Sequence, residues 1–327
     1  MRCTNKKRRA LVLVMVLALL VSGCGKKQPD PNAYRIYESS YNYRITAAAP
    51  VEEVPLFAGK LCIAGDKDIG TKKVDSSVAE AGAVFNNTTR DTVYAQNVYD
   101  KMYPASTTKI LTAYLAIKYG NLDEVYTVSE HACDQAYDSS VAKLSPGDQM
   151  TLRDLLYGLM LASGNDAAIA IAEGMDGDEA TFVKRMNEEA KKLGATKSHF
   201  VTPNGLHDEE HYTTAYDMYL IYSAALEKKA FRKLISATEY TSRFKGAGGA
   251  AKELTWTTTN GYLTGDYKMP GGITVVGGKT GTTGQAGYCL VLLSENEKKE
   301  QLVSIVFHAD CRSNLYHLMS QILAMGK

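Results

Sequence analysis

Residues 103–119 read Tyr-Pro-Ala-Ser-Thr-Thr-Lys-Ile-Leu-Thr-Ala-Tyr-Leu-Ala-Ile-Lys-Tyr, and this stretch decides how the rest of the chain is interpreted. Pro104 suits the first turn of a helix, and Gly120 is typical of the position just past a helix end. Ser106 and Lys109 are three residues apart in the first turn, so they share one face of that helix. The apolar side chains recur at helical spacing, which predicts a largely buried helix; they are Ile110, Leu111, Tyr114, Leu115 and Ile117.

This pair of side chains suggests nucleophilic catalysis. A serine hydroxyl is a poor nucleophile until a neighbour takes its proton, and a lysine can do so only when burial or a nearby cation lowers its pKa. Ser-x-x-Lys alone is common by chance, however, and a surface helix that begins with a serine cap also explains it.

Two further motifs follow in a consistent order. Ser163-Gly164-Asn165 comes after the amphipathic run 155–161, and Lys279-Thr280-Gly281 lies between a Val/Gly-rich stretch and the apolar run 288–293. Ser-x-x-Lys, Ser-Asp-Asn and Lys-Thr-Gly form the signature of penicillin-binding proteins and class A β-lactamases, and here Gly164 replaces the aspartate. The gaps of 57 and 116 residues between the three motifs leave room for a helical subdomain and a return to a sheet.

Residues 80–327 resemble a D-alanyl-D-alanine carboxypeptidase, one of the low-molecular-weight penicillin-binding proteins. The resemblance implies an α+β fold of the β-lactamase/transpeptidase type, in which helices cover an antiparallel sheet and a helical subdomain is inserted. The phrases that carry it are Tyr-Pro-Ala-Ser-Thr-Thr-Lys (103–109), Ala-Ser-Gly-Asn-Asp-Ala-Ala (162–168), Pro-Asn-Gly-Leu-His (203–207) and Gly-Gly-Lys-Thr-Gly-Thr-Thr-Gly-Gln-Ala-Gly-Tyr (277–288).

The resemblance also implies catalytic roles. Ser106 would attack the carbonyl of the D-alanyl-D-alanine bond and form an acyl-enzyme, with Lys109 as its general base. Lys279 and burial would lower the pKa of Lys109. Ser163 would pass the proton to the leaving amine, and Asn165 would hold the acyl side-chain amide and orient Lys109.

The same resemblance implies which residues would bind the substrate carboxylate and the oxyanion. Backbone N–H groups of Ser106 and Thr282 would form the oxyanion hole, because such donors act where negative charge develops. Thr259 stands where some relatives have an arginine, so carboxylate binding would depend more on the lysine and the threonines. The substrate-binding segment is Lys279, Thr280, Gly281 and Thr282.

Hydrophobic periodicity elsewhere predicts strands at both ends of the domain and helices between them, which is typical of α+β architecture. The sheet would then be formed by segments that are distant in sequence. We expect strands at 81–85, 92–95, 288–294 and 302–308, and helices at 106–119, 151–162, 167–173, 179–193, 214–226 and 313–324.

The N-terminus has the pattern of an export signal. A basic segment precedes the 12-residue apolar run 10–21, which is short for a membrane span but suits a signal peptide. Val-Ser-Gly-Cys at 21–24 resembles a bacterial lipobox and predicts lipid modification of Cys24; an ordinary cleavage site is the alternative. We expect a lipoprotein signal at 1–23, a flexible tether at 24–60 and a catalytic domain at 61–327, with a strand near 41–45 as an alternative within the tether.

Charge and composition exclude several partners. Removal of residues 1–23 would leave 32 basic and 36 acidic residues, a net charge near −4 that argues against nucleic-acid binding. The remaining cysteines lack Cys-x-x-Cys spacing, so neither metal nor redox cofactor is expected, and disulfide pairing cannot be deduced. His207-Asp208-Glu209-Glu210-His211 fits an inverted zinc-protease pattern, but the turn at 203–205 predicts a loop that would not place both histidines on one helix face.

Three other functions compete with carboxypeptidase activity. A class A β-lactamase needs a glutamate that activates the deacylating water, and residues 200–206 contain none, so inhibition by penicillin is expected. A non-catalytic β-lactam or peptidoglycan sensor usually carries a transmembrane signalling region, which the pattern here lacks. A peptidoglycan endopeptidase would use the same three motifs. The expected partners are therefore peptidoglycan stem peptides, β-lactams as covalent inhibitors, and the outer face of a bacterial membrane through the N-terminal lipid.

Overall fold

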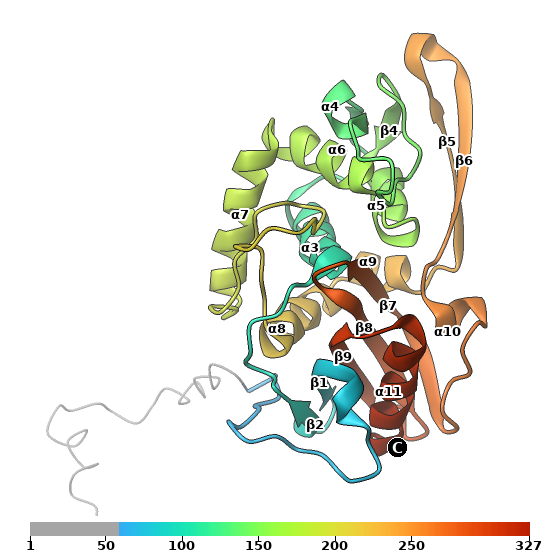
Figure 1. Cartoon of the computed structure of the whole chain (residues 1–327). Helices are drawn as coiled ribbons and strands as arrows, with labels where there is room; N and C mark the ends of the chain where they lie inside the picture. The colour runs from blue at the N-terminus through green and yellow to red at the C-terminus, as the bar shows by residue number, and fades with distance from the viewer. Residues whose placement is uncertain (1–58) are drawn as a thin grey trace, which may run out of the picture. The chain divides into compact units, whose positions relative to one another are not determined.

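The computed structural model describes residues 59–327, and a five-stranded antiparallel sheet forms its centre (Figure 1). The predicted leader, Cys24, the alternative strand near 41–45 and nearly all of the predicted tether lie outside the described residues. The order of the strands in the sheet is β2-β1-β9-β8-β7. Their bounds are β1 Ala79–Asn86, β2 Asp91–Gln96, β7 Ile273–Thr283, β8 Gly287–Asn296 and β9 Gln301–Ala309.

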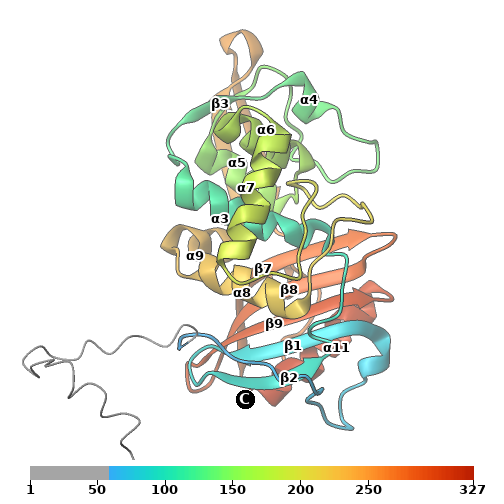
Figure 2. The same ribbon diagram turned by 90° about the vertical axis from the view of Figure 1, so that its left-hand side faces the viewer.

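The two ends of the domain meet in this sheet. β1 pairs with the neighbouring β2 and also with β9, which begins more than 200 residues later; Ala83, for example, lies opposite Ile305. Figure 2 shows β1 between β2 and β9, with β8 on the far side of β9. The expected sheet of sequence-distant segments is therefore confirmed. β7, which carries Lys279-Thr280-Gly281, is the edge strand opposite β2.

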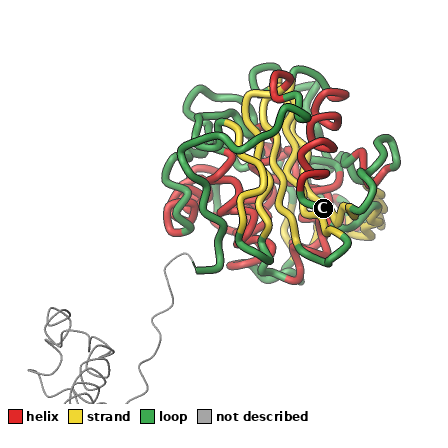
Figure 3. Tube along the Cα trace, turned by 90° about the horizontal axis from the view of Figure 1, so that it is seen from below, coloured by secondary structure: helices red, strands yellow, loops and turns green. Residues whose placement is uncertain are grey.

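The central strands β8 and β9 are mostly apolar because both faces of the sheet are covered (Figure 3). Side chains alternate between faces along a strand. In β8, Val291 and Leu293 pack into the core beneath the helical part of the domain, whereas Leu290 and Leu292 pack against α11 (Arg312–Met325). A run without polar alternation therefore marks a strand that is buried on both sides.

Helices connect the two halves of the sheet. The predicted helices at 151–162, 179–193 and 214–226 are confirmed within a few residues, and Thr151 caps its helix by accepting a hydrogen bond from Asp154 N. No helix within residues 59–327 is both long and apolar enough to cross a membrane. The helices are α3 Lys109–Tyr119, α4 Glu130–Cys133, α5 Leu152–Leu161, α6 Asn165–Asp176, α7 Glu179–Lys192, α8 Ala215–Leu226, α9 Lys229–Ile235 and α10 Gly261–Thr264, with short 3₁₀ turns η2 Ser76–Val78, η3 Ala105–Thr108 and η4 Ala247–Gly249.

A second sheet was not predicted. It has the order β3-β4-β5-β6, and its long hairpin stands at the upper right of Figure 1 and contacts α5. Most side chains of this hairpin are exposed or half-buried, so its sequence lacks the apolar alternation that reveals a strand. Tyr240 stacks on Tyr157 of α5, with ring centroids 3.7 Å apart, and attaches the hairpin to the domain. The strands are β3 Val125–Thr127, β4 Gln149–Thr151, β5 Glu239–Lys245 and β6 Ala251–Thr257.

Candidate active site

Ser106 and Lys109 lie where the 3₁₀ turn η3 passes into α3. Side chains three residues apart are nearly eclipsed in a 3₁₀ turn, and Lys109 Nζ donates a hydrogen bond of 2.9 Å to Ser106 Oγ. Ala105 has a positive φ of 48°, an unusual conformation for a residue with a side chain. The predicted pairing of this hydroxyl and amine is therefore present, and a strained backbone directly precedes the serine.

Lys109 is completely buried among polar acceptors. Besides Ser106, its Nζ donates to Asn165 Oδ1 at 2.8 Å and to the carbonyl oxygen of Asn204 at 2.7 Å. Burial lowers the pKa of Lys109 well below its usual value, and the charge of Lys279 lowers this pKa further, whereas Asp166 opposes the shift. The amine is thus held in place while its neutral form is favoured, which is what a general base requires.

Ser163 and Lys279 form a second hydroxyl–amine pair. Lys279 Nζ donates to Ser163 Oγ at 2.9 Å and to Thr280 O at 2.8 Å. Burial lowers the pKa of Lys279 to about 7. Ser163 lies between α5 and α6 with a positive φ of 57°, and Asn165 is the first residue of α6. The side chain of Asn165 accepts a hydrogen bond from Lys109 Nζ.

Strand β7 brings the third motif next to Ser106. A Cβ atom added to Gly281 would lie 2.9 Å from Ser106 N, so only glycine lets the strand come this close. The predicted oxyanion donors, the N–H groups of Ser106 and Thr282, are therefore on adjoining backbone segments. Thr280 Oγ1 lies 2.6 Å from Thr259 Oγ1.

Two cavities flank Ser106. One, of about 270 Å³, lies toward α11 and is lined by Ser163, Thr280 and Arg312 among others. The other, of about 280 Å³, lies toward the loops and is lined by Asp138, Asn165 and Leu206 among others. Ser106 thus lies in the middle of a cleft that can hold a peptide chain on both sides of this residue.

Comparison with known proteins agrees with this geometry. The family model described as D-alanyl-D-alanine carboxypeptidase matches residues 70–311. The chain belongs to this family. Both the resemblance and the fold expected from the sequence are therefore confirmed.

Individual members of the family differ in how much of their length is matched. D-alanyl-D-alanine carboxypeptidase DacF of Bacillus subtilis is 36% identical over 239 residues, which cover 71% of this chain and 57% of that protein. The D-alanyl-D-alanine carboxypeptidase of Streptomyces sp. strain K15 is 34% identical over 70% of this chain and 80% of the relative. The crystal structure of the Streptomyces K15 DD-transpeptidase superposes with a TM-score of 0.70 at 31% identity, covering 76% of this chain and 97% of that one.

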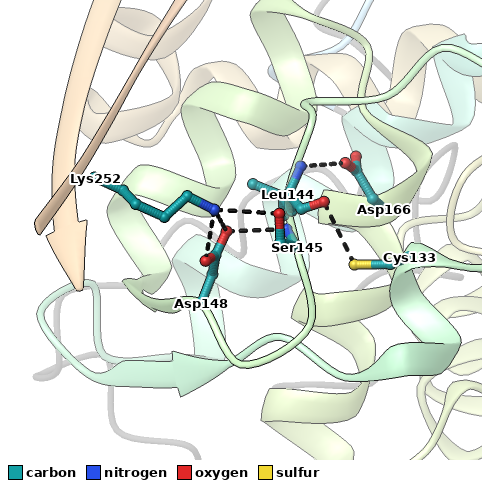
Figure 4. A network of polar contacts seen from close by, with 6 residues as sticks. All are labelled: Cys133, Leu144, Ser145, Asp148, Asp166 and Lys252. Carbon is teal, nitrogen blue, oxygen red and sulfur yellow. Dashed lines mark hydrogen bonds and ion pairs between the residues drawn. The ribbon is translucent and has the colours of Figure 1, made fainter. Parts of the chain in front are cut away.

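In this family member, a polar network fixes the end of the loop 134–147, at Leu144 and Ser145 (Figure 4). Asp166, at the start of α6, accepts a hydrogen bond of 3.0 Å from Leu144 N. The buried carboxylate of Asp148 accepts two bonds of 2.8 Å from Lys252 on β6. Ser140, which lines both cavities, accepts from Asn165 N at 2.8 Å. The position of this loop therefore depends on α6 and on the unpredicted hairpin.

Three site residues were not found from the sequence. Asn204 contributes a backbone carbonyl, which no sequence pattern marks as a ligand. Arg312 is an ordinary surface residue by its sequence context and lines the cleft because α11 begins there. Asp166 directly follows the second motif, and that adjacency is the signal that could have revealed it.

The segment that fits an inverted zinc-protease pattern is not helical. His207 is exposed and packs edge-on against Tyr103 at 4.7 Å between centroids, whereas His211 is buried beside Thr108. Among residues 59–327 no cluster of three His, Cys, Asp or Glu side chains is arranged to hold a metal ion. The cysteines of this range, Cys62, Cys133, Cys289 and Cys311, are unpaired.

Proposed function

We propose that the chain is a serine-type D-alanyl-D-alanine carboxypeptidase. It would remove the terminal D-alanine from peptidoglycan stem peptides through an acyl-enzyme on Ser106, and β-lactams would inhibit it covalently. The observation that carries this proposal is the 2.9 Å contact between Ser106 Oγ and the completely buried amine of Lys109. Membership of the family and the named activities of its relatives support it.

In the first half-reaction, neutral Lys109 takes the proton of Ser106 as Oγ bonds to the carbonyl carbon of the penultimate D-alanine. The N–H groups of Ser106 and Thr282 would stabilise the oxyanion. The tetrahedral intermediate collapses when the C–N bond breaks and the proton taken by Lys109 passes through Ser163 to the leaving amine, which leaves Lys109 neutral again. Water then attacks the ester, Lys109 takes a proton from it, and Ser106 is released with its hydroxyl restored.

The cavity toward α11 would hold the terminal carboxylate. Lys279 and the hydroxyls of Thr280 and Thr282 would bind it, as the family resemblance implies, with Gly281 giving the substrate room. We add Arg312 to this set, since it lines the same cavity and its guanidinium suits a carboxylate. Asn165, in the opposite cavity, would hold the acyl-side amide.

The decisive experiment compares soluble wild-type domain, beginning near residue 59, with Ser106→Ala. We expect wild type to release D-alanine from a pentapeptide that ends in D-Ala-D-Ala and to gain the mass of penicillin, and the variant to do neither. Release that survives the substitution would show that another residue is the nucleophile. Rapid turnover of penicillin by wild type would favour a β-lactamase.

Acyl transfer is a specific alternative, because the structural neighbour from Streptomyces K15 is named a DD-transpeptidase. Adding an amine acceptor to the same assay separates the two: formation of a transpeptidation product at the expense of hydrolysis would favour transfer. Cleavage of a cross-linked dimer would favour endopeptidase activity. Penicillin attachment without turnover of any peptide would favour a sensor.

We also propose that the protein is exported and anchored to the outer face of a bacterial membrane through a lipid on Cys24. The basic segment, the apolar run and the lipobox-like Val-Ser-Gly-Cys support this proposal. Fractionation of cells that express the full chain and Cys24→Ala tests it. We expect the wild type in the membrane fraction and the variant outside that fraction.

A further inference from the structure

His211 is a buried histidine that the proposed chemistry does not use. Its side chain is 2% exposed, and its Nε2 lies 2.8 Å from Thr108 Oγ1, in the turn between Ser106 and Lys109. Its other ring nitrogen, Nδ1, accepts hydrogen bonds from the backbone N–H groups of Val201 at 3.1 Å and Thr202 at 3.3 Å. Because both of these partners are donors, Nδ1 is unprotonated, and Nε2 carries the hydrogen and donates it to Thr108.

The loop 200–206 delivers a carbonyl group to the catalytic lysine. Asn204 O accepts a hydrogen bond of 2.7 Å from Lys109 Nζ, and Pro203 O accepts one of 2.6 Å from Thr112 Oγ1 of α3. Phe200, at the start of the loop, exchanges two hydrogen bonds with the side chain of Asn187. His211 satisfies the two backbone donors between these anchor points, so it joins the loop to the turn that carries the nucleophile.

Loss of this bridge would release the loop next to the reacting atoms. The partly buried N–H groups of Val201 and Thr202 would be left without protein partners, and such donors turn to water instead, so the segment would shift outward. Any such shift moves the Asn204 carbonyl away from Lys109 Nζ. A base displaced by about 1 Å can lose on the order of 100-fold in rate.

We propose that His211 is a positioning residue for the reaction: as a neutral imidazole bridging Thr108 and the 201–202 backbone, it fixes the Asn204 carbonyl that orients Lys109. This inference rests on the proposed function of Ser106 and Lys109. His211 itself touches neither the nucleophile nor the cleft.

The environment keeps this imidazole neutral. Burial lowers the pKa of His211 to about 4; the negative charge of Asp208 opposes the shift, and the basic side chains of His199, His207 and Lys109 add to it. Protonation would turn Nδ1 from an acceptor into a donor that faces two other donors. The bridge is therefore intact between about pH 5 and 8, the range in which this pKa leaves the ring neutral.

Stopped-flow acylation by penicillin tests the proposal, with His211→Phe, His211→Gln and a matched control, His199→Gln, at an exposed histidine near the same loop. Phenylalanine fills the space without an acceptor, whereas glutamine offers both an acceptor and a donor. We expect the acylation rate constant to fall about 100-fold in His211→Phe and less in His211→Gln. The dissociation constant of the preacylation complex should stay within about threefold, because His211 does not line the cleft.

Nitrogen-15 NMR of wild-type protein supplies a readout that needs no variant to fold. We expect one histidine to remain a neutral Nε2–H tautomer from pH 5 to 8. Titration of His211 between pH 6 and 7, or equal acylation rate constants in wild type and His211→Phe, would overturn the inference about His211 but leave the proposed function intact. Absence of acylation in the wild type would overturn the proposed function, and this inference with it.

Discussion

The two walls of the cleft around Ser106 are built differently. One wall is strand β7, whose position is set by a regular backbone ladder; Lys279 lies opposite Val291, and Gly281 lies opposite Cys289. The other wall consists of the loops 134–147 and 200–206. Their positions are set by a few buried side chains that bind backbone groups, above all Asp166 and His211.

This difference determines where single substitutions should matter. A ladder distributes its hydrogen bonds over many equivalent residues, so the loss of one side chain leaves the strand in place. A loop held by a few buried polar groups has no such redundancy, since each lost partner leaves a buried N–H or C=O unsatisfied. Single substitutions in the loop wall should therefore disturb the alignment of the catalytic groups more than single substitutions in the sheet wall.

Lys109 contacts both the loop 200–206, through Asn204 O, and the proposed nucleophile Ser106. Its replacement should therefore have the largest effect on the acylation rate. Lys109→Met keeps an unbranched side chain in the buried site but removes the base. We expect acylation by penicillin to slow by about 10²- to 10⁴-fold, the usual contribution of general acid–base catalysis. Thermal unfolding of the same sample serves as the control for folding. A loss below about tenfold would mean that another group takes the proton.

Two glycines allow the walls to be compared directly, because each approaches the turn of Ser106 from one side. A Cβ on Gly205 would lie 1.9 Å from Ala105 O, and its φ is +86°; a Cβ on Gly281 would lie 2.9 Å from Ser106 N in a regular strand. Gly205→Ala adds a backbone penalty of roughly 1–2 kcal/mol to the clash.

We therefore expect Gly205→Ala to lower both the acylation rate and the unfolding midpoint in urea by more than Gly281→Ala does. The reverse order would contradict the proposed difference between the walls.

Lys279→Met should have a smaller effect and a different signature. The charge of Lys279 helps to lower the pKa of Lys109, so its removal raises that pKa. Since the reaction needs neutral Lys109, the acidic limb of the pH–rate profile should move to higher pH. The Michaelis constant for a D-Ala-D-Ala peptide should also rise, because the carboxylate loses a cation. An acidic limb at the wild-type pH would show that the two lysines are not coupled.

Asp138→Asn should have the smallest effect. This exposed carboxylate lines the acyl-side cavity and has no hydrogen-bond or ion-pair partner within the described part of the chain. It should favour stem peptides that carry a free side-chain amine. We expect kcat/KM to fall by about two- to fivefold for such a peptide, as for an exposed ion pair, and to stay constant for its N-acetylated form. Equal effects on both peptides would exclude this role.

The family, the α+β architecture and the serine and lysine motifs were predictable because they depend on local patterns. The sequence alone reveals the apolar runs in β8 and β9, the helix bounded by Pro104 and Gly120, and the three motifs in order. The hairpin β5–β6 was missed since its strands are largely exposed, and a solvated strand leaves a weak apolar pattern.

The sequence by itself determined which residue types could react: a serine with a lysine at helical spacing, and a second serine and lysine in order. Only the tertiary structure decided what surrounds them. The Asn204 carbonyl on Lys109, the guanidinium of Arg312 at the cleft and the His211 bridge all join segments that are distant in the chain. Burial and long-range hydrogen bonds set the pKa of a lysine and the position of a loop, and these properties exist only once the chain has folded.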